Sequence, residues 1–257
     1  MIAITRGVPD SVIACELTHL QREPIDAETA RRKHSHYEKA LAELGCEVRR
    51  IEADERYPDC VFIEDTAIVL DEVAVLSRPG AESRRGEVDA VAPLLGEYRP
   101  LLHIDAPATL DGGDVLLVER TLFVGLSTRT ESGAVEQLGR LLGPYGYHVV
   151  PVPLGGALHL KTAVTLVARQ TLLIDRSLVS DGPFRGLTLI DVDPAEQFAA
   201  NALRIGETVL MPSAFPLTRR RLEDHDIKVV TVDASELAKA EGGVTCSSLL
   251  VAKRRAN

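Results

Sequence analysis

The segment Phe62-Ile-Glu-Asp-Thr-Ala-Ile-Val-Leu-Asp-Glu-Val-Ala-Val-Leu76 decides the fold, because its pattern recurs along the chain. A polar junction comes first, and two short apolar runs joined by a polar pair follow, which is typical of a β-hairpin. The last residues of successive junctions are 49, 47, 40 and 45 positions apart. A period in this range indicates a repeat architecture. The five junctions are Phe62–Asp65, Leu110–Asp114, Leu158–Lys161, Phe198–Asn201 and Gly243–Cys246.

A helix signal and a third apolar run follow the hairpins, so the repeating unit is predicted to be ββαβ. The clearest helix begins after Asp26, which is a good N-cap, and ends at Gly45. A second helix is expected to begin at Ser83. The segment 177–187 contains two glycines and a proline, so it is expected to hold one helical turn or none. The third strands are expected at Cys46–Ile51, Leu101–Ile104, His148–Val152, Leu187–Val192 and Lys228–Val232.

The fifth unit lacks its second strand, because the chain ends there. The N-terminal segment Ile2-Ala-Ile-Thr-Arg6 resembles Val73-Ala-Val-Leu-Ser-Arg78, which is a second strand with its following residues. We therefore expect the N-terminal strand to complete the fifth unit and to close the five ββαβ units into a ring. Residues 1–257 contain no linker-like stretch, so the sequence predicts a single domain.

Composition limits the class of partner. The net charge of −9 argues against nucleic acid, because no basic stripe is present to neutralise phosphates. No run of 18 apolar residues and no secretory leader pattern occurs, so neither a membrane span nor secretion is expected. Four cysteines lie far apart without a C-x-x-C pair, which favours reduced thiols in the cytoplasm.

Chemically useful side chains lie at the junctions. Cys246 follows paired glycines, and His159 takes the same position in its own repeat. Together they are candidates for a nucleophile and its base. Asp111 precedes a Gly-Gly pair and is a candidate for orienting the histidine. The alternatives are a buried structural cysteine, a structural histidine and a turn aspartate.

Three carboxylates crowd one junction, at Asp59, Glu64 and Asp65. Because like charges repel, the group predicts a nearby cation, which is either a metal or a positively charged substrate. The lack of a second histidine near a junction favours the substrate.

Six motifs together resemble the dimethylarginine dimethylaminohydrolase family, whose fold is the five-bladed α/β propeller (pentein). The resemblance extends over essentially the whole chain. It therefore implies this fold for a single catalytic domain, with the N-terminal strand closing the ring. The motifs are Asp59–Asp65, Ser77–Arg85, Thr109–Asp114, Gly125–Arg129, Leu158–Lys161 and Gly242–Cys246.

The resemblance implies a hydrolase that converts dimethylated or monomethylated arginine to citrulline. Cys246 would attack the guanidinium carbon, and His159 would protonate the departing amine and then activate water. Asp111 stands where the family's histidine-orienting acid lies. Lys161 occupies the place where arginine deiminases and amidinotransferases carry a carboxylate, which favours a methylated substrate. The implied substrate-binding residues are Leu17, Asp59, Glu64, Asp65, Arg84, Arg129 and Ala240.

Two other functions stay open from the sequence. One is an arginine deiminase-like or amidinotransferase-like enzyme acting on another guanidino compound. The other is a non-catalytic ribosome anti-association factor with the same ring fold, which the presence of Cys246, His159 and Asp111 disfavours. We expect a monomer or homodimer that uses neither a cofactor nor a metal.

Overall fold

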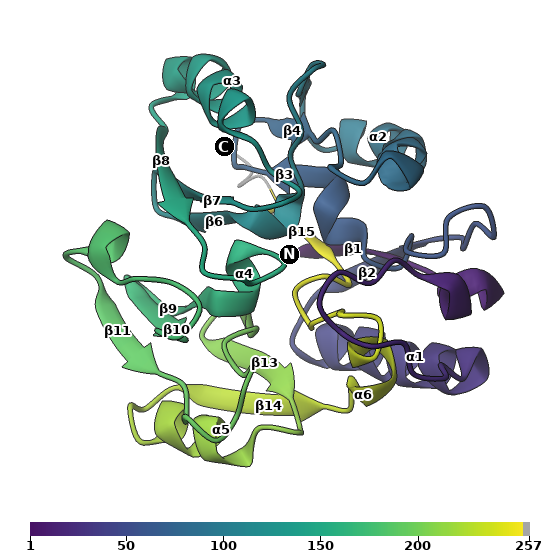
Figure 1. The fold of residues 1–257 in the computed structure, drawn as a ribbon, viewed down its shortest axis with the longest axis vertical. Helices are drawn as coiled ribbons and strands as arrows, with labels where there is room; N and C mark the ends of the chain where they lie inside the picture. The colour runs from purple at the N-terminus through teal and green to yellow at the C-terminus, as the bar shows by residue number, and fades with distance from the viewer. Residues whose placement is uncertain (254–257) are drawn as a thin grey trace.

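Five three-stranded sheets surround a common centre in the computed structural model, which describes residues 1–253 (Figure 1). This arrangement confirms the predicted five-bladed α/β propeller. In each sheet the middle strand is antiparallel to the inner strand and parallel to the outer one. From inner to outer, the strands are β15 (Leu249–Val251), β1 (Ile2–Arg6) and β2 (Glu47–Ile51); β3 (Ala67–Val69), β4 (Ala74–Leu76) and β5 (Leu101–His103); β6 (Val115–Val118), β7 (Thr121–Leu126) and β8 (His148–Pro153); β9 (Val164–Ala168), β10 (Thr171–Ile174) and β11 (Thr188–Asp191); β12 (Leu203–Ile205), β13 (Thr208–Pro212) and β14 (Lys228–Val232).

The N-terminal strand closes the ring as the sequence predicts. Strand β1 pairs antiparallel with β15, with Ile2 opposite Val251 and Ile4 opposite Leu249. On its other side β1 pairs parallel with β2. One blade is thus made from the two ends of the chain, so the ring cannot form until both are in place.

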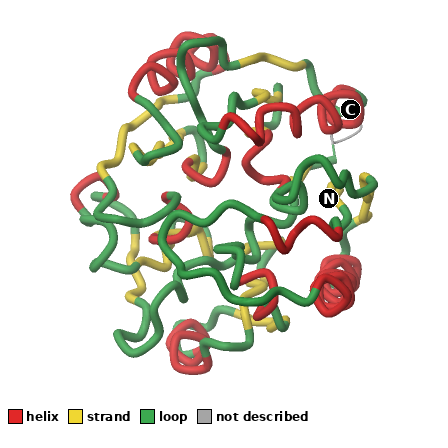
Figure 2. Tube along the Cα trace, turned by 45° about the vertical axis from the view of Figure 1, so that its right-hand side comes forward, coloured by secondary structure: helices red, strands yellow, loops and turns green. Residues whose placement is uncertain are grey.

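The longer helices connect middle to outer strands and lie around the outside of the strands (Figure 2). Asp26 caps the first helix as expected, because its side chain accepts a hydrogen bond from the Thr29 amide at 2.8 Å. The second helix begins at Val88 rather than Ser83, because Glu82–Glu87 forms a 3₁₀ segment. Between β10 and β11 only a 3₁₀ turn, Gly182–Phe184, is present, as predicted. The α-helices are α1 (Ala27–Glu43), α2 (Val88–Gly96), α3 (Ser132–Leu142), α4 (Leu160–Ala163), α5 (Pro216–Glu223) and α6 (Ser235–Ala238).

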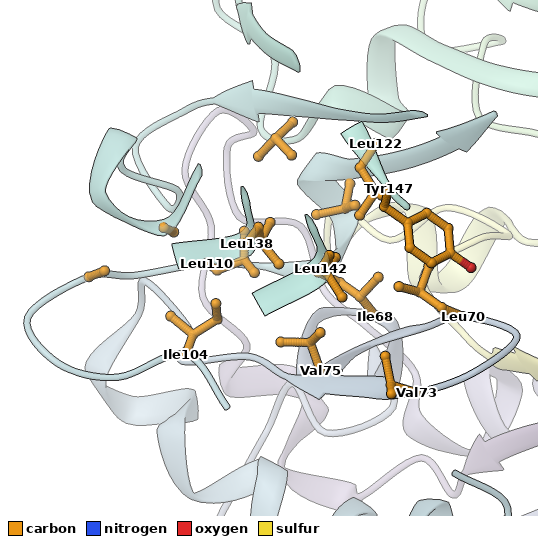
Figure 3. Close-up of a cluster of buried hydrophobic side chains, with 14 residues drawn as sticks. Ile68, Leu70, Val73, Val75, Ile104, Leu110, Leu122, Leu138, Leu142 and Tyr147 are labelled. Carbon is orange, nitrogen blue, oxygen red and sulfur yellow. The ribbon is translucent and has the colours of Figure 1, made fainter. Parts of the chain in front are cut away.

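The hydrophobic core is divided among the spaces between neighbouring blades. In one of these spaces, Leu138 and Leu142 of α3 pack toward Ile68 of β3 and Val75 of β4 (Figure 3). All four side chains are buried. Burying a leucine of this kind stabilises the fold by roughly 1.5–3 kcal/mol. Because five such clusters each join two neighbouring blades, the packing fixes the angle between blades and so the positions of the junctions at the centre.

No helix within residues 1–253 has both the length and the apolar composition to cross a lipid bilayer.

Candidate active site

Side chains from four of the five junctions form a hydrogen-bonded cluster at the centre of the ring. The Lys161 ammonium donates to Glu64 at 2.6 Å and to the Gly112 carbonyl at 3.1 Å. The Thr245 hydroxyl donates to the other Glu64 oxygen at 2.7 Å. The Asn201 amide donates to the Lys161 carbonyl and to Thr245. The junctions therefore converge at the centre of the ring, and Gly112 supplies the remaining junction's contact.

Two cavities share Glu64, Lys161 and Thr245 as lining residues. One has a volume of about 430 Å³ and also contains Cys246 and His159. The other has a volume of about 220 Å³ and is walled mainly by residues of the inner strands. The Glu64–Lys161 ion pair thus lies between the reactive side and the strand-lined side of the centre.

His159 is held between two carboxylates. Its Nε2 lies 3.0 Å from Asp111 Oδ2, and its Nδ1 lies 3.8 Å from Asp65 Oδ1. Burial alone would lower the pKa of His159, but Asp65, Asp111 and Asp114 outweigh burial and raise this pKa to about 10. The imidazole is therefore a cation at neutral pH and can act as a general acid. Asp111 occupies the orienting position that the sequence suggested.

The carboxylate of Asp65 is balanced by cations of the protein itself. Arg84 Nη1 donates to Asp65 Oδ2 at 2.6 Å, and the same guanidinium donates to Glu87. Burial would raise the pKa of Asp65, but His159 and Arg84 hold it well below its usual range. The sequence argument considered only a metal or a substrate cation and so missed these cations of the protein. Arg84 offsets Asp65, and Lys161 offsets Glu64.

Cys246 lines the same two cavities as His159. Its sulfur accepts a hydrogen bond from the Gly243 amide at 3.3 Å. Burial and the carboxylates of Glu64 and Asp65 raise the pKa of the Cys246 thiol to about 12. The paired glycines serve close packing, since a Cβ on Gly242 would lie 2.1 Å from the Phe62 ring.

A third, smaller cavity adjoins Cys246 and His159 and is lined by most of the charged residues expected at the site. Asp59, Asp65, Arg84, Arg129 and Ala240 all line it, and its volume is about 30 Å³. With Glu16 and Glu241, its wall brings together four carboxylates and two guanidinium groups beside Cys246 and His159.

The N-terminal segment covers this smaller cavity. Arg129 contacts Glu16 at 3.5 Å and the Thr18 hydroxyl at 3.1 Å. Asp59 accepts the Glu16 amide at 3.1 Å. Leu17 lines neither reactive cavity and packs instead against the cluster that contains Val12 and Phe62.

Several contacts at the site were missed from the sequence. Lys161 is 97 positions from Glu64, and no local pattern reveals that the two form an ion pair. The Glu241 carboxylate accepts hydrogen bonds from three consecutive amides, those of Thr18, His19 and Leu20. Asp114 accepts the Leu160 amide at 2.9 Å and so fixes the chain just after His159. Of these contacts, the sequence gave an indication only for Asp114, because this residue lies at a junction.

One group of side chains has ligand types that a metal could use. One ligand atom from each of Asp65, Asp111 and His159 lies within 4.8 Å of the others. Each group already has a protein partner: Arg84 for Asp65, the Gly80 amide for Asp111, and both carboxylates for His159. The arrangement matches an ion-paired histidine.

The sequence and the fold of this chain are similar to those of known proteins. The family model described as "N,N dimethylarginine dimethylhydrolase, eukaryotic" matches residues 16–251. A dimethylarginine dimethylaminohydrolase from Pseudomonas aeruginosa is 34% identical over 226 residues, which cover 87% of this chain and 89% of the relative. The chain belongs to the dimethylarginine dimethylaminohydrolase family.

Other members agree with this assignment. The dimethylarginine dimethylaminohydrolase of Streptomyces coelicolor is 37% identical over 234 residues, covering 91% of this chain and 90% of the relative. A cysteine-to-serine mutant of the Pseudomonas aeruginosa enzyme, complexed with citrulline, superposes with a TM-score of 0.92 at 32% identity. That superposition covers 96% of this chain and 97% of the other. The family's pentein fold, expected from the motifs, is thereby confirmed.

Proposed function

We propose that this protein hydrolyses Nω,Nω-dimethyl-L-arginine and Nω-monomethyl-L-arginine to L-citrulline and the corresponding methylamine. The observation that carries the proposal is the meeting of Cys246 and His159 where a charged cavity adjoins a larger one. The charged groups that line the smaller cavity suit the amino-acid end of the substrate, which enters its volume of about 30 Å³ only when the covering N-terminal segment moves. The larger cavity suits the methylated nitrogen. Family membership and the relative's citrulline complex support the same reaction.

The raised pKa of Cys246 means that substrate must help to form the nucleophile. With a pKa of about 12, only about one thiol in 10⁵ is ionised at pH 7. Glu64 and Asp65 contribute to this elevation, so a guanidinium cation bound beside them offsets their charge and lowers the pKa of the thiol. The enzyme is therefore most nucleophilic when its substrate is bound.

The reaction then proceeds in two balanced steps. The Cys246 thiolate adds to the guanidinium carbon, and the C–N bond breaks as the His159 imidazolium gives its proton to dimethylamine. A covalent thiouronium and a neutral imidazole remain. The imidazole next takes one proton from water as the oxygen adds to the same carbon. The remaining hydroxyl proton passes to the sulfur as the C–S bond breaks, so citrulline and the Cys246 thiol are released beside a protonated His159.

Substrate binding is assigned to the expected residues. Asp65, with Glu64, grips the guanidinium, and Asp59 contacts the substrate. Arg129 and Arg84 bind the α-carboxylate, and the backbones of Leu17 and Ala240 contact the amino-acid end. Arg84 already donates to Asp65 and Glu87, so Arg129 carries the larger share of this binding.

The experiment is to measure citrulline and dimethylamine release from the dimethylated substrate, beside unmodified arginine and the Cys246→Ser variant. We expect turnover of the methylated substrate, and a loss of about 10⁴-fold or more in the variant. Ammonia release from arginine at a greater rate would replace the proposal with a deiminase. A Cys246→Ser variant that keeps its activity would refute the nucleophile.

We also propose that residues 1–257 act as one catalytic domain in the cytoplasm, as a monomer or homodimer, without nucleic acid, metal or cofactor. Light scattering with size exclusion tests the oligomeric state. Activity that disappears on dialysis against a chelator and returns with one metal ion would overturn the metal-free mechanism.

A further inference from the structure

The cavity on one side of Cys246 is much larger than two methyl groups require. Its volume of about 430 Å³ would hold roughly fourteen water molecules at liquid density. Cavities of this size accommodate whole small ligands. The smaller, charged cavity shares Leu158, His159 and Cys246 with it, so the reactive pair stands at the boundary.

The position of Cys246 and His159 between the two cavities sets the orientation of the bound substrate. The amino-acid end of the substrate needs the carboxylates and arginines of the smaller cavity. A guanidinium whose carbon lies at Cys246 then points its outermost nitrogen away from those charges. Because His159 stands at the same boundary, the leaving nitrogen and its substituents face the larger cavity.

Most of the surface that lines the larger cavity is apolar. Phe198, Phe215, Leu178 and Pro212 contribute to it. Phe198 is 43% exposed although it is a large aromatic residue, and its backbone has a φ of +66°. A non-glycine residue in the left-handed region costs of order 1–3 kcal/mol, and such residues cluster at functional sites. The chain thus keeps a strained backbone at an exposed aromatic residue that lines this space.

We propose that the larger cavity is a subsite for alkyl groups longer than methyl, and that the enzyme hydrolyses Nω-alkyl-L-arginines such as the n-butyl compound. This inference rests on the proposed function and names a wider substrate class for the same site. The bonds are those already described: the C–N bond to the alkylamine breaks as the Cys246 S–C bond forms. His159 gives its proton to the departing alkylamine, and water completes the release of citrulline.

The first test is a substrate series with Nω-methyl, ethyl, propyl and butyl arginine, with citrulline and the released amine both quantified. Each buried methylene can improve binding by up to about fourfold. We expect kcat/KM for the butyl compound to stay within tenfold of the methyl compound. A larger drop overturns the subsite while leaving the proposed function intact. Failure of the dimethyl and monomethyl compounds themselves would instead refute the proposed function.

The second test is Phe198→Gly, because glycine adopts the left-handed backbone without strain and the variant should fold. We expect the ratio of kcat/KM for butyl over methyl arginine to fall at least threefold. Tyr145→Ala, which removes an exposed aromatic far along the chain, is the matched control and should keep the wild-type ratio. An unchanged ratio in Phe198→Gly would show that the ring does not contact the alkyl chain.

Discussion

Replacing Asp111 by asparagine tests how the protein keeps His159 protonated. The Asp111 carboxylate lies 3.0 Å from His159 Nε2, and both side chains are buried. At this distance and an effective dielectric constant of about 20, one charge pair is worth about 5.5 kcal/mol, or about four pKa units. Asparagine keeps a hydrogen-bond acceptor, so a fall of about 1–3 units is expected. The pKa of His159 should drop from about 10 to between about 7 and 9.

The assay is an NMR titration of ¹³C-labelled histidine in both proteins, with His159 assigned from a His159→Gln variant. In parallel, kcat for the dimethylated substrate should fall by about 10²–10⁴ in Asp111→Asn, because a misdirected imidazole loses general acid–base catalysis. The alkaline limb of the pH–rate profile should move to lower pH with the pKa.

Asp105→Asn is the control, because it makes the same substitution in an exposed loop. It should leave the pKa of His159 within about 0.3 unit of the wild-type value. A shift of less than half a unit in Asp111→Asn, with kcat unchanged, would refute the assignment of Asp111 as the orienting acid.

Four further predictions follow from the same contacts. Lys161→Met leaves Glu64 without its counterion and should lower the free energy of unfolding by about 2–4 kcal/mol in urea melts. The double variant with Glu64→Gln should recover part of this loss. No recovery would mean that the two side chains are not coupled. Glu241→Gln weakens the acceptor of the Thr18, His19 and Leu20 amides, so hydrogen exchange there should quicken about tenfold, whereas exposed Glu43→Gln should change nothing. Gly242→Ala would set a Cβ 2.1 Å from the Phe62 ring and should lower kcat at least about tenfold; wild-type activity would contradict this packing. The pKa of His159 is about 6.5 in the unfolded chain and about 10 in the folded protein, so the stability that its protonation contributes is complete below pH 6.5 and is lost as the pH rises to about 10. The melting temperature should therefore fall across this pH range, and it is measured in Cys246→Ser to remove the titration of that thiol. A melting temperature that does not change with pH would contradict the shift.

The sequence by itself determined the repeating unit, the ring and the reactive pair. Apolar runs of strand length between polar residues specify strands locally, so the third strand predicted at Lys228–Val232 has the bounds observed for β14. The likeness of Ile2–Arg6 to a second strand was enough to place it beside β15. Cys246, His159 and Asp111 stood out because they occupy equivalent positions or glycine-marked turns in a repeat.

Only the tertiary structure decided how the charges at the centre are balanced. Glu64 meets Lys161, and Asp65 meets Arg84, because packing between blades brings residues from different repeats together. Sequence spacing describes neighbours within a strand or helix, whereas these pairs depend on the angle between blades. For the same reason, the sequence did not predict that Leu17 packs against a hydrophobic cluster. Nor did any sequence pattern predict the mainly apolar cavity that Phe198 lines. Local patterns specify elements, and the geometry of the ring specifies which charges and spaces those elements share.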